Sequence, residues 1–358
     1  MGKLAVYKYL SFMMLVLTVL VAVFTFFGLF GGNANPATST AMALLVYVLP
    51  IFIIADVVML IFWLIRKRWH WAAIPGVTLI FCIPYIGTIW QPGLFRSTDE
   101  SKSGVKVCTY NVCSFGRKAS GFQAQAILNE MKNNQVDVIC MQEYLEENAD
   151  TIGNSAYYLE YFADWARGRD DMAIFSRFPI MDSQAIDFGP GTNNSAMWAD
   201  IDVRGKVLRF FNVHLETTGI NGTLHQAAKQ VQNDPIHQKT SSSKLLSAIF
   251  GNYTRGMIRR AIQADLVAKE IQKSPYPVVV CGDFNDVPYS FVYRTMKGDL
   301  VDGFKEAGKG YMYTFRGKKN VRIDYIFHSE EGLEGMHYYK EDVSYSDHLP
   351  VFLKIALE

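Results

Sequence analysis

The stretch PVVVCGDFND, residues 277–286, joins a run of apolar residues to a group of polar ones. The consecutive apolar residues Val278 to Cys281 are typical of a short strand buried in a sheet. Asp283 and Asn285 follow where that strand ends. Polar side chains at the ends of packed strands can converge on one cleft. Residues 277–286 therefore predict a buried strand that delivers a carboxylate and a carboxamide to a site.

Polar residues interrupt other apolar runs in the same way, each near the end of a predicted strand. These groups are Tyr110-Asn111, Gln142-Glu143, Asn212-Val213-His214, Arg322-Ile323-Asp324-Tyr325 and Ser346-Asp347-His348-Leu349-Pro350. Any one of them has a simpler interpretation as a turn, a structural histidine or an ion-pair partner. Together they indicate a functional site, because burying so many unpaired polar groups without a ligand would be costly.

The side chains in these groups are mainly carboxylates, carboxamides and two histidines, His214 and His348. Oxygen-rich donor sets suit Mg²⁺ or Mn²⁺, whereas zinc favours cysteine and histidine. The sequence contains neither the nucleophile elbow of serine hydrolases nor the G-x-x-x-x-G-K-[ST] phosphate loop. We therefore expect water to attack a substrate oxyanion with the help of a hard cation.

Between these groups, strand-like and helix-like segments alternate. We predict strands at 105–111, 136–143, 171–177, 195–203, 207–216, 277–285, 321–328 and 349–356, and helices at 122–134, 255–273 and 290–296. The polar stretch before residue 243 predicts a loop or an irregular helix. Alternation combined with adjacent strand pairs predicts an α/β (α+β) fold of mixed sheets with helices outside.

The first 96 residues have a different composition from the rest. Three apolar runs, at about residues 9–30, 41–65 and 71–90, each reach the roughly 20 residues that a helix needs to cross a bilayer. The sequence therefore predicts a multi-pass integral membrane protein. Its three parts are a membrane anchor at 1–96, a polar linker at 97–104 and a catalytic domain at 105–358.

The charged residues predict how these helices are oriented. Basic residues precede the first run, the loop 31–40 has no charge, and Arg66-Lys67-Arg68 follows the second run. The positive-inside rule places the N-terminus in the cytoplasm, and three crossings then place the catalytic domain outside it. If the third run, which contains Pro75 and Pro84, were only interfacial, the domain would lie in the cytoplasm.

Other side chains of the anchor also have predicted roles. Asp56 within the second run is a functional candidate, or else a protonated side chain satisfied by a neighbouring helix. Tryptophan anchors helices in the membrane interface, and four tryptophans lie near the predicted helix ends: Trp63, Trp69, Trp71 and Trp90.

Charge and cysteine content limit the possible functions of the catalytic domain. Residues 97–358 contain 29 basic and 33 acidic side chains, a net charge of −4, without the broad basic footprint of a strong non-specific nucleic-acid binder. The basic segment 316–322 is either a local anion-binding loop or a solvated hairpin tip. The cysteines show no metal-binding spacing and predict buried thiols, with a disulfide between neighbouring strands still open in an oxidising compartment.

As a set, the motifs resemble the endonuclease/exonuclease/phosphatase superfamily, whose members include DNase I-like nucleases, inositol polyphosphate 5-phosphatases and neutral sphingomyelinases. The matching motifs are TYN at 109–111, QE at 142–143, NVHLE at 212–216, GDFND at 282–286, RIDYIF at 322–327 and SDHLP at 346–350. They cover nearly all of 105–352. The resemblance implies a four-layer sandwich of two mixed β-sheets flanked by helices.

The resemblance also implies a role for each site residue. Glu143 is the main metal ligand, Asn111 lies beside it and Asp347 helps. Asp283 orients and deprotonates the attacking water, and Asn285 holds that water or a phosphate oxygen. His348 binds the phosphoryl group with Asp324 fixing its tautomer, His214 donates to a phosphate oxygen, and Arg177 is a further substrate-binding candidate. All of these residues are present in the sequence.

One position departs from part of the family, and the substrate stays open. Some abasic-site endonucleases carry an acidic residue two positions after the asparagine, where this chain has Cys113, which puts a second metal site in doubt. Tethering to a bilayer favours a phospholipid or sphingolipid head group as substrate. The alternatives are a membrane-tethered nuclease acting on non-cytoplasmic nucleic acid, and a catalytically silent sensor of phosphorylated ligands.

Overall fold

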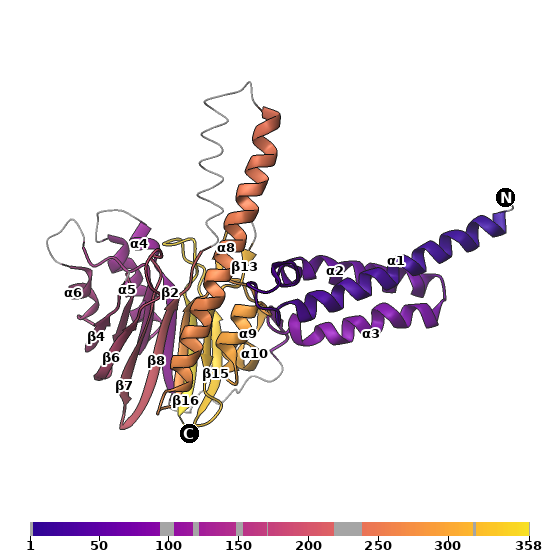
Figure 1. Ribbon diagram of the computed structural model, residues 1–358. Coiled ribbons are helices and arrows are strands. Elements are labelled where there is room, and N and C mark those ends of the chain that lie inside the picture. The colour runs from indigo at the N-terminus through magenta and orange to yellow at the C-terminus, as the bar shows by residue number, and fades with distance from the viewer. Residues whose placement is uncertain are drawn as a thin grey trace. The chain divides into compact units, whose positions relative to one another are not determined.

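The computed structural model describes residues 3–93, 104–116, 122–147, 153–169, 171–217, 238–317 and 320–357 (Figure 1). The predicted linker, 97–104, lies outside the described residues except for Gly104. The chain forms two compact units. The first comprises Met1–Thr88 with Pro288–Arg294, and the second comprises Ile89–Val287 with Thr295–Glu358.

The first unit contains three long helices, as the apolar runs predict: α1 (Lys3–Gly31), α2 (Thr40–Ile65) and α3 (Trp69–Ile86). All three are long and apolar enough to cross a membrane, which suggests membrane association. The third helix has 18 residues and ends at Ile86, four residues before the predicted limit. Trp90 is instead part of a β-strand.

Polar side chains join these helices inside the bundle. Asp56 is fully buried and lies 2.5 Å from the Thr25 hydroxyl of α1. Trp63 is also fully buried, and its indole N–H donates to Thr18 across 2.9 Å. The prediction that Trp63 is an interfacial anchor is therefore wrong, because this tryptophan satisfies its N–H within the bundle.

The second unit is built on two six-stranded sheets. The first sheet has the order β15-β16-β2-β3-β5-β4, and the second has the order β10-β14-β9-β8-β7-β6. Each sheet has one parallel pair at its centre, β2 with β3 and β8 with β9, and antiparallel pairs elsewhere. The predicted pair of mixed sheets is confirmed.

The strands of these sheets are short. Those of the first sheet are β2 (Gly104–Asn111), β3 (Val138–Gln142), β4 (Asp164–Arg167), β5 (Ala173–Ser176), β15 (Leu333–Lys340) and β16 (Val351–Leu357). Those of the second are β6 (Ile180–Ile186), β7 (Ala196–Val203), β8 (Lys206–His214), β9 (Val278–Asp283), β10 (Val301–Asp302) and β14 (Asp324–His328). The predicted hairpin between β7 and β8 is present. Its turn residues Arg204 and Gly205 both have positive φ, which suits the twist of a two-residue hairpin.

Two small ribbons and six helices complete the described part of the second unit's fold. The ribbons pair β1 (Trp90–Gln91) with β11 (Gly310–Tyr311) and β12 (Phe315–Arg316) with β13 (Asn320–Val321). The helices are α4 (Cys113–Gly116), α5 (Phe122–Asn133), α6 (Asn154–Tyr158), α8 (Gln238–Gln272), α9 (Phe291–Lys297), whose first four residues belong to the first unit, and α10 (Gly303–Ala307). Helix α8 begins at Gln238, so the expectation of a helix that starts at residue 255 is wrong by several helical turns.

Apolar side chains fill the space between the sheets and the space under the helices. One buried cluster joins Val107 and Val138 of the first sheet to Phe210 and Val279 of the second. Another packs α5 and α6 on the outer face of the first sheet. Cys82, Cys108, Cys140 and Cys281 are buried thiols, as predicted, and Cys113 is half-buried; none of the five forms a disulfide.

Candidate active site

Three predicted site residues lie in one row across the second sheet. In the strand register, Asp324 of β14 is opposite Asp283 of β9, and Asp283 is opposite His214 of β8. Register partners on neighbouring strands project to the same face of a sheet. The sheet therefore brings two carboxylates and an imidazole together from segments that are far apart in sequence.

Asp283 lies at the centre of this group and is almost fully buried. Its carboxylate accepts hydrogen bonds from the Asn111 amide at 3.1 Å, the Asn285 amide at 3.3 Å and the Asn285 backbone N–H at 2.9 Å. Burial raises the pKa of the Asp283 carboxyl, while the neighbouring His348 opposes that shift. A carboxylate that is held in place but is reluctant to stay ionised is suited to accept a proton.

The backbone around Asp283 is specialised. Gly282 has φ 151°, and a Cβ there would come within 2.0 Å of the Val213 carbonyl oxygen, so only glycine fits between β9 and β8. Asn285 has φ 51°, a conformation that non-glycine residues rarely adopt. Its amide donates to the Leu215 carbonyl across 2.9 Å. The left-handed turn thus fixes the Asn285 side chain between β8 and the Asp283 carboxylate.

His348 forms a buried pair with Asp324. The ring Nδ1 lies 3.0 Å from both Asp324 oxygens, and Nε2 lies 3.5 Å from the Asp283 carboxylate. Burial disfavours the charged ring, but the charges of Asp324 and Asp283 outweigh burial and raise the pKa of His348 to about 10. His348 is therefore a cation at neutral pH, and its Nδ1–H donates to Asp324.

His214 behaves differently from His348. Its Nε2 lies 3.7 Å from Asp283, and burial lowers the pKa of His214, against the charges of Asp283 and Glu143. The two histidines of the site therefore favour different protonation states. One supplies a fixed positive charge, and the other supplies a neutral ring.

The first sheet contributes Asn111 and Glu143. The Asn111 amide donates to Glu143 across 3.2 Å and to Asp283 across 3.1 Å, and its carbonyl oxygen accepts from the Cys113 backbone N–H. Glu143 follows β3 with φ 52° and is half-buried. Left-handed backbone at a non-glycine residue is a form of strain that collects at functional sites. We call Asn111, Glu143, His214, Asp283, Asn285, Asp324 and His348 the strand-end cluster.

The strand-end cluster has donors suited to a hard divalent cation. Glu143 offers carboxylate oxygens at its half-exposed side, where the Asn111 amide donates to it, and Asp347 is an exposed carboxylate beside His348. Donor atoms of Asp283, Asp324 and His348 also lie within 4.8 Å of one another. Asp324 and His348, however, are already bonded to each other, so the Glu143 side fits a cation better.

The structure does not bring Arg177 to the cluster. This residue follows β5 at the end of the strand where Ser176 pairs with Val138, the start of β3, whereas Glu143 follows the other end. Its guanidinium pairs with Asp137 at 3.0 Å and lies over the Tyr161 ring. A substrate-binding role for Arg177 has no support in this position.

The basic segment 316–322 does not form one anion-binding loop in the residues described. The Arg316 guanidinium donates to Asp342 and to the Ser346 carbonyl, which fixes the loop before His348. Arg322 is fully buried and makes a two-point ion pair with Asp302 at 2.8 and 2.6 Å. Lys318 and Lys319 lie outside the described residues. Both arginines therefore bind groups within the protein and support the segments that carry the strand-end cluster.

Sequence reasoning gave no role to three supporting side chains, although Ser346 is part of the SDHLP motif. The Thr314 hydroxyl accepts from the backbone N–H groups of Ile323 and Asp324, each across 3.0 Å. The Phe315 ring packs 4.9 Å from the His348 ring. The Ser346 hydroxyl donates to the Asn111 carbonyl across 2.8 Å and so ties the His348 loop to β2. A threonine, a phenylalanine and a serine carry no distinctive chemical signal in sequence.

A buried carboxamide pair joins the two sheets beneath the cluster. Gln142 of β3 donates to Asn212 of β8 across 2.6 Å. The Asn212 amide donates in turn to the carbonyls of Met141 and Ala173 in the first sheet, across 2.8 and 2.9 Å. Both side chains are fully buried. We call Gln142 and Asn212 the inter-sheet bridge.

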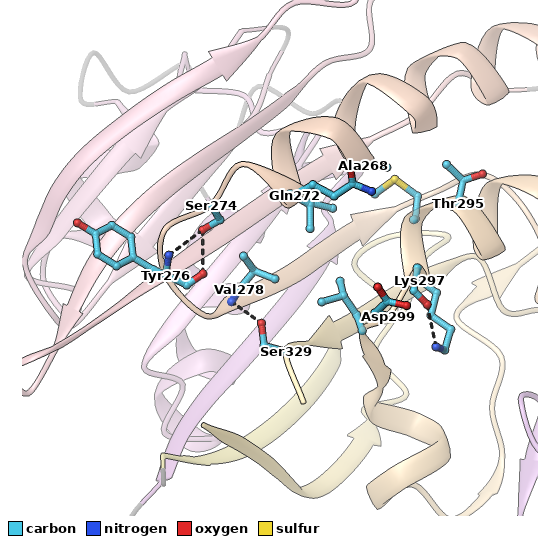
Figure 2. A pocket seen from close by; sticks show the side chains of 13 residues that line it. Ala268, Gln272, Ser274, Tyr276, Val278, Thr295, Lys297, Asp299 and Ser329 are labelled. Atoms are coloured by element: carbon cyan, nitrogen blue, oxygen red, sulfur yellow. Dashed lines mark hydrogen bonds between the residues drawn. The ribbon is translucent and has the colours of Figure 1, made fainter. Parts of the chain in front are cut away.

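A separate pocket lies at the opposite end of β9 (Figure 2). It has a volume of about 260 Å³ and is lined by the end of α8, the start of β9 and residues 295–300. Its polar groups bond to one another, as Ser329 does to the Val278 N–H and Ser274 does to Tyr276 (Figure 2). The pocket is therefore distinct from the strand-end cluster and lacks the cluster's convergence of charged groups.

Comparison with models of known protein families identifies the family of this chain. The model of the endonuclease/exonuclease/phosphatase family matches residues 108–348, about two thirds of the chain. The chain belongs to the endonuclease/exonuclease/phosphatase family. This confirms the resemblance and the assignment to the phosphoesterase class, since the family groups nucleases and phosphatases. Residues 11–89 match a domain of unknown function, DUF8431.

Solved structures of this family share the fold. An endonuclease/exonuclease/phosphatase from Bacteroides vulgatus is 18% identical with a TM-score of 0.50, covering 72% of this chain and 100% of its own. A humanized Danio rerio TDP2 is 17% identical with a TM-score of 0.51, covering 70% and 98%. The human Nocturnin catalytic domain with bound sulfate is 17% identical with a TM-score of 0.50, covering 75% and 100%. A search of curated proteins found no match.

Proposed function

We propose that this endonuclease/exonuclease/phosphatase family member is a Mg²⁺- or Mn²⁺-dependent hydrolase of phosphoesters in phospholipid or sphingolipid head groups. The observation that carries the proposal is the convergence of Asp283, Asp324 and His348 with Asn111 and Glu143 from the other sheet. Such a set of buried charges and amides has no role in packing that apolar residues would not perform better. A catalytically silent sensor would not need Asp283 held as a proton acceptor.

In the proposed reaction, each residue of the site has a separate role. Asp283 orients the attacking water and takes its proton, as the water oxygen bonds to phosphorus and the bond to the leaving oxygen breaks. The His348 cation, oriented by Asp324, stabilises the charge that builds on the phosphoryl oxygens. Asn285 holds the Asp283 carboxylate in position for the attacking water. His214 donates to a further oxygen. A bound divalent cation, held by Glu143 with Asn111 and Asp347, would supply charge neutralisation to the phosphate and the leaving group.

The preference for a lipid rests on tethering. The three apolar helices hold the second unit on a bilayer, which raises the local concentration of head groups far above that of dilute soluble substrates. The net charge of −4 in residues 97–358 does not favour nucleic acid. We further propose the non-cytoplasmic side of the membrane for this unit, from the basic loop Arg66-Lys67-Arg68 and the number of helices.

A parallel assay tests this function. The full-length protein, with Mg²⁺, is given supercoiled plasmid and vesicles of mixed phospholipid and sphingolipid, and nicks and released phosphorylated products are measured. We expect products from vesicles that disappear with EDTA and with His348→Ala, and that persist with the matched variant His337→Ala on β15. Nicking that depends on His348, without head-group release, would replace the lipid proposal with the nuclease alternative.

Protease accessibility tests the side of the membrane. In cells whose outer barriers have been permeabilised, an added protease that cannot cross the inner bilayer should cleave within residues 97–358. Full protection of that region would place the domain in the cytoplasm and would show that the third apolar run does not cross.

A further inference from the structure

The second unit begins with a short ribbon that follows the last apolar helix. Trp90 of β1 is the register partner of Tyr311 of β11, and the Met312 backbone N–H donates to the Ile89 carbonyl across 2.8 Å. Partners in an antiparallel pair project to the same face, with Cβ atoms about 5 Å apart. The ribbon therefore displays the two aromatic side chains together.

These side chains are large and exposed. Trp90 is 50% exposed and Tyr311 is 51% exposed. Tyr313 lies beside them, with its ring centroid 5.6 Å from that of Tyr311. We call Trp90, Tyr311 and Tyr313 the aromatic patch. The other exposed large apolar side chains described in this unit lie on elements outside the patch, such as Met181 on β6 and the pair Ile262 and Leu266 on α8.

Lysines lie next to the aromatic patch. The Lys340 ammonium is 3.6 Å from the centre of the Tyr313 ring. Lys309 is exposed and immediately precedes β11. Aromatic rings with a polar tip, next to cationic side chains, match the head-group layer of a bilayer, where apolar and charged groups meet.

Covalent geometry keeps the patch close to α3. Trp90 is four residues after Ile86, the last residue of α3, so the two Cα atoms can be at most about 14 Å apart whatever the orientation of the unit. The 18 residues of α3 span about 27 Å, slightly less than the hydrocarbon thickness, which leaves both helix ends near its boundary.

We propose that the aromatic patch, with Lys309 and Lys340, is a membrane-contact surface that rests in the head-group layer of the bilayer. Two observations favour a bilayer over a protein partner. The helix that precedes the patch in the chain, α3, is long and apolar enough to cross a membrane. The charged side chains that flank the patch are cationic. The contact is distinct from the spanning helices, since all of its residues belong to the second unit.

The patch is directly connected to the strand-end cluster. Three residues beyond Tyr311, Thr314 holds the backbone of Asp324. The next residue, Phe315, pairs with the His348 backbone and packs on the His348 ring. Resting the patch in the head-group layer would therefore fix the depth of the His348–Asp324 pair relative to lipid phosphates. This last step depends on the proposed lipid substrate, whereas the contact itself does not.

A depth measurement tests the contact without relying on activity. In the full-length protein carrying Cys113→Ser, Tyr311→Cys is labelled with an environment-sensitive thiol dye, and Met181→Cys serves as the matched exposed control. The protein is placed in vesicles of phosphatidylcholine with phosphatidylglycerol. We expect a blue-shifted label at 311 that spin-labelled lipid quenches, and a label at 181 that it does not. Equal emission and quenching at both positions would overturn the proposal.

A rate ratio then tests the link to lipid cleavage. Trp90→Ala with Tyr311→Ala should lower, several-fold, the ratio of hydrolysis of vesicle lipid to hydrolysis of a soluble phosphodiester, whereas Met181→Ala should leave the ratio as it is. An unchanged ratio would overturn the depth-setting role. If no lipid is cleaved by the unmodified protein, the substrate proposal fails while the dye measurement still decides the contact.

Discussion

The two sheets of the second unit have the same pattern of strand directions but supply different chemistry. Each has one parallel pair at its centre and antiparallel neighbours on both sides. The second sheet ends in the buried row of Asp324, Asp283 and His214. The first sheet ends in Asn111 and the half-buried Glu143. Burial on one side favours proton transfer, and partial exposure on the other allows a hydrated cation to enter.

The two sheets therefore perform different tasks in the site: one favours proton transfer, and the other admits a cation. The side with shifted pKa values is closed to solvent, which strengthens the electrostatic interaction between Asp283 and His348. The side with oxygen donors is left accessible. The Asn111 contacts, the inter-sheet bridge and the bond between His348 and Asp324 join the two halves, among the side-chain hydrogen bonds described near the cluster. Four changes, ordered by expected effect, test this division.

Asp283→Asn should have the largest effect, because it removes the proton acceptor but retains the shape of the buried row. We expect the hydrolysis rate to fall by about 10²–10⁴-fold, with folding kept, as measured by turnover and by circular dichroism. Asp182→Asn on the exposed strand β6 is the matched control and should retain its activity. Near-normal turnover by Asp283→Asn would assign the proton transfer elsewhere.

Glu143→Gln should act on the other half through the cation. A neutral amide binds Mg²⁺ less well than a carboxylate, so the cation concentration for half-maximal rate should rise, on the order of tenfold or more, and added Mg²⁺ should restore part of the rate. A Mg²⁺ titration of both proteins measures this. A lower rate with an unchanged titration midpoint would contradict the role of Glu143 as a ligand.

Asn212→Leu should loosen the connection between the halves. The substitution leaves Gln142 and the carbonyls of Met141 and Ala173 without their buried partner, which should cost on the order of 3 kcal/mol of unfolding free energy. Chemical unfolding of the second unit's spectroscopic signal gives the value. Asn129→Leu on the exposed face of α5 is the control, and an equal loss there would show that the bridge has no special role.

Arg177→Ala should have the smallest effect. The residue is half-exposed and pairs with Asp137 far along β3 from Glu143, and exposed ion pairs contribute only about 0–1 kcal/mol. We expect KM and kcat within about twofold of the unmodified protein. A large rise in KM would restore the substrate-binding role that the sequence motif suggested.

Elements whose pattern is local were predictable from sequence. The buried strands β3 and β9 are mainly continuous apolar runs, β2 is an apolar strand interrupted by Lys106, and the hairpin of β7 and β8 alternates around a glycine turn. The edge strand β6 was missed, because its side chains are mostly exposed and show no apolar alternation. The start of α8 at Gln238 was missed because the sequence there is polar.

The sequence by itself determined the three apolar helices, the alternation of strands and helices, and the identity of the polar groups at strand ends, since each depends on neighbouring residues. Only the tertiary structure decided which of those groups meet. It set Asp324, Asp283 and His214 in one row, left Arg177 away from them, used Arg322 as a buried support, and joined Trp90 to Tyr311. The physical reason is that strand register and sheet packing are settled by contacts between residues far apart in the chain.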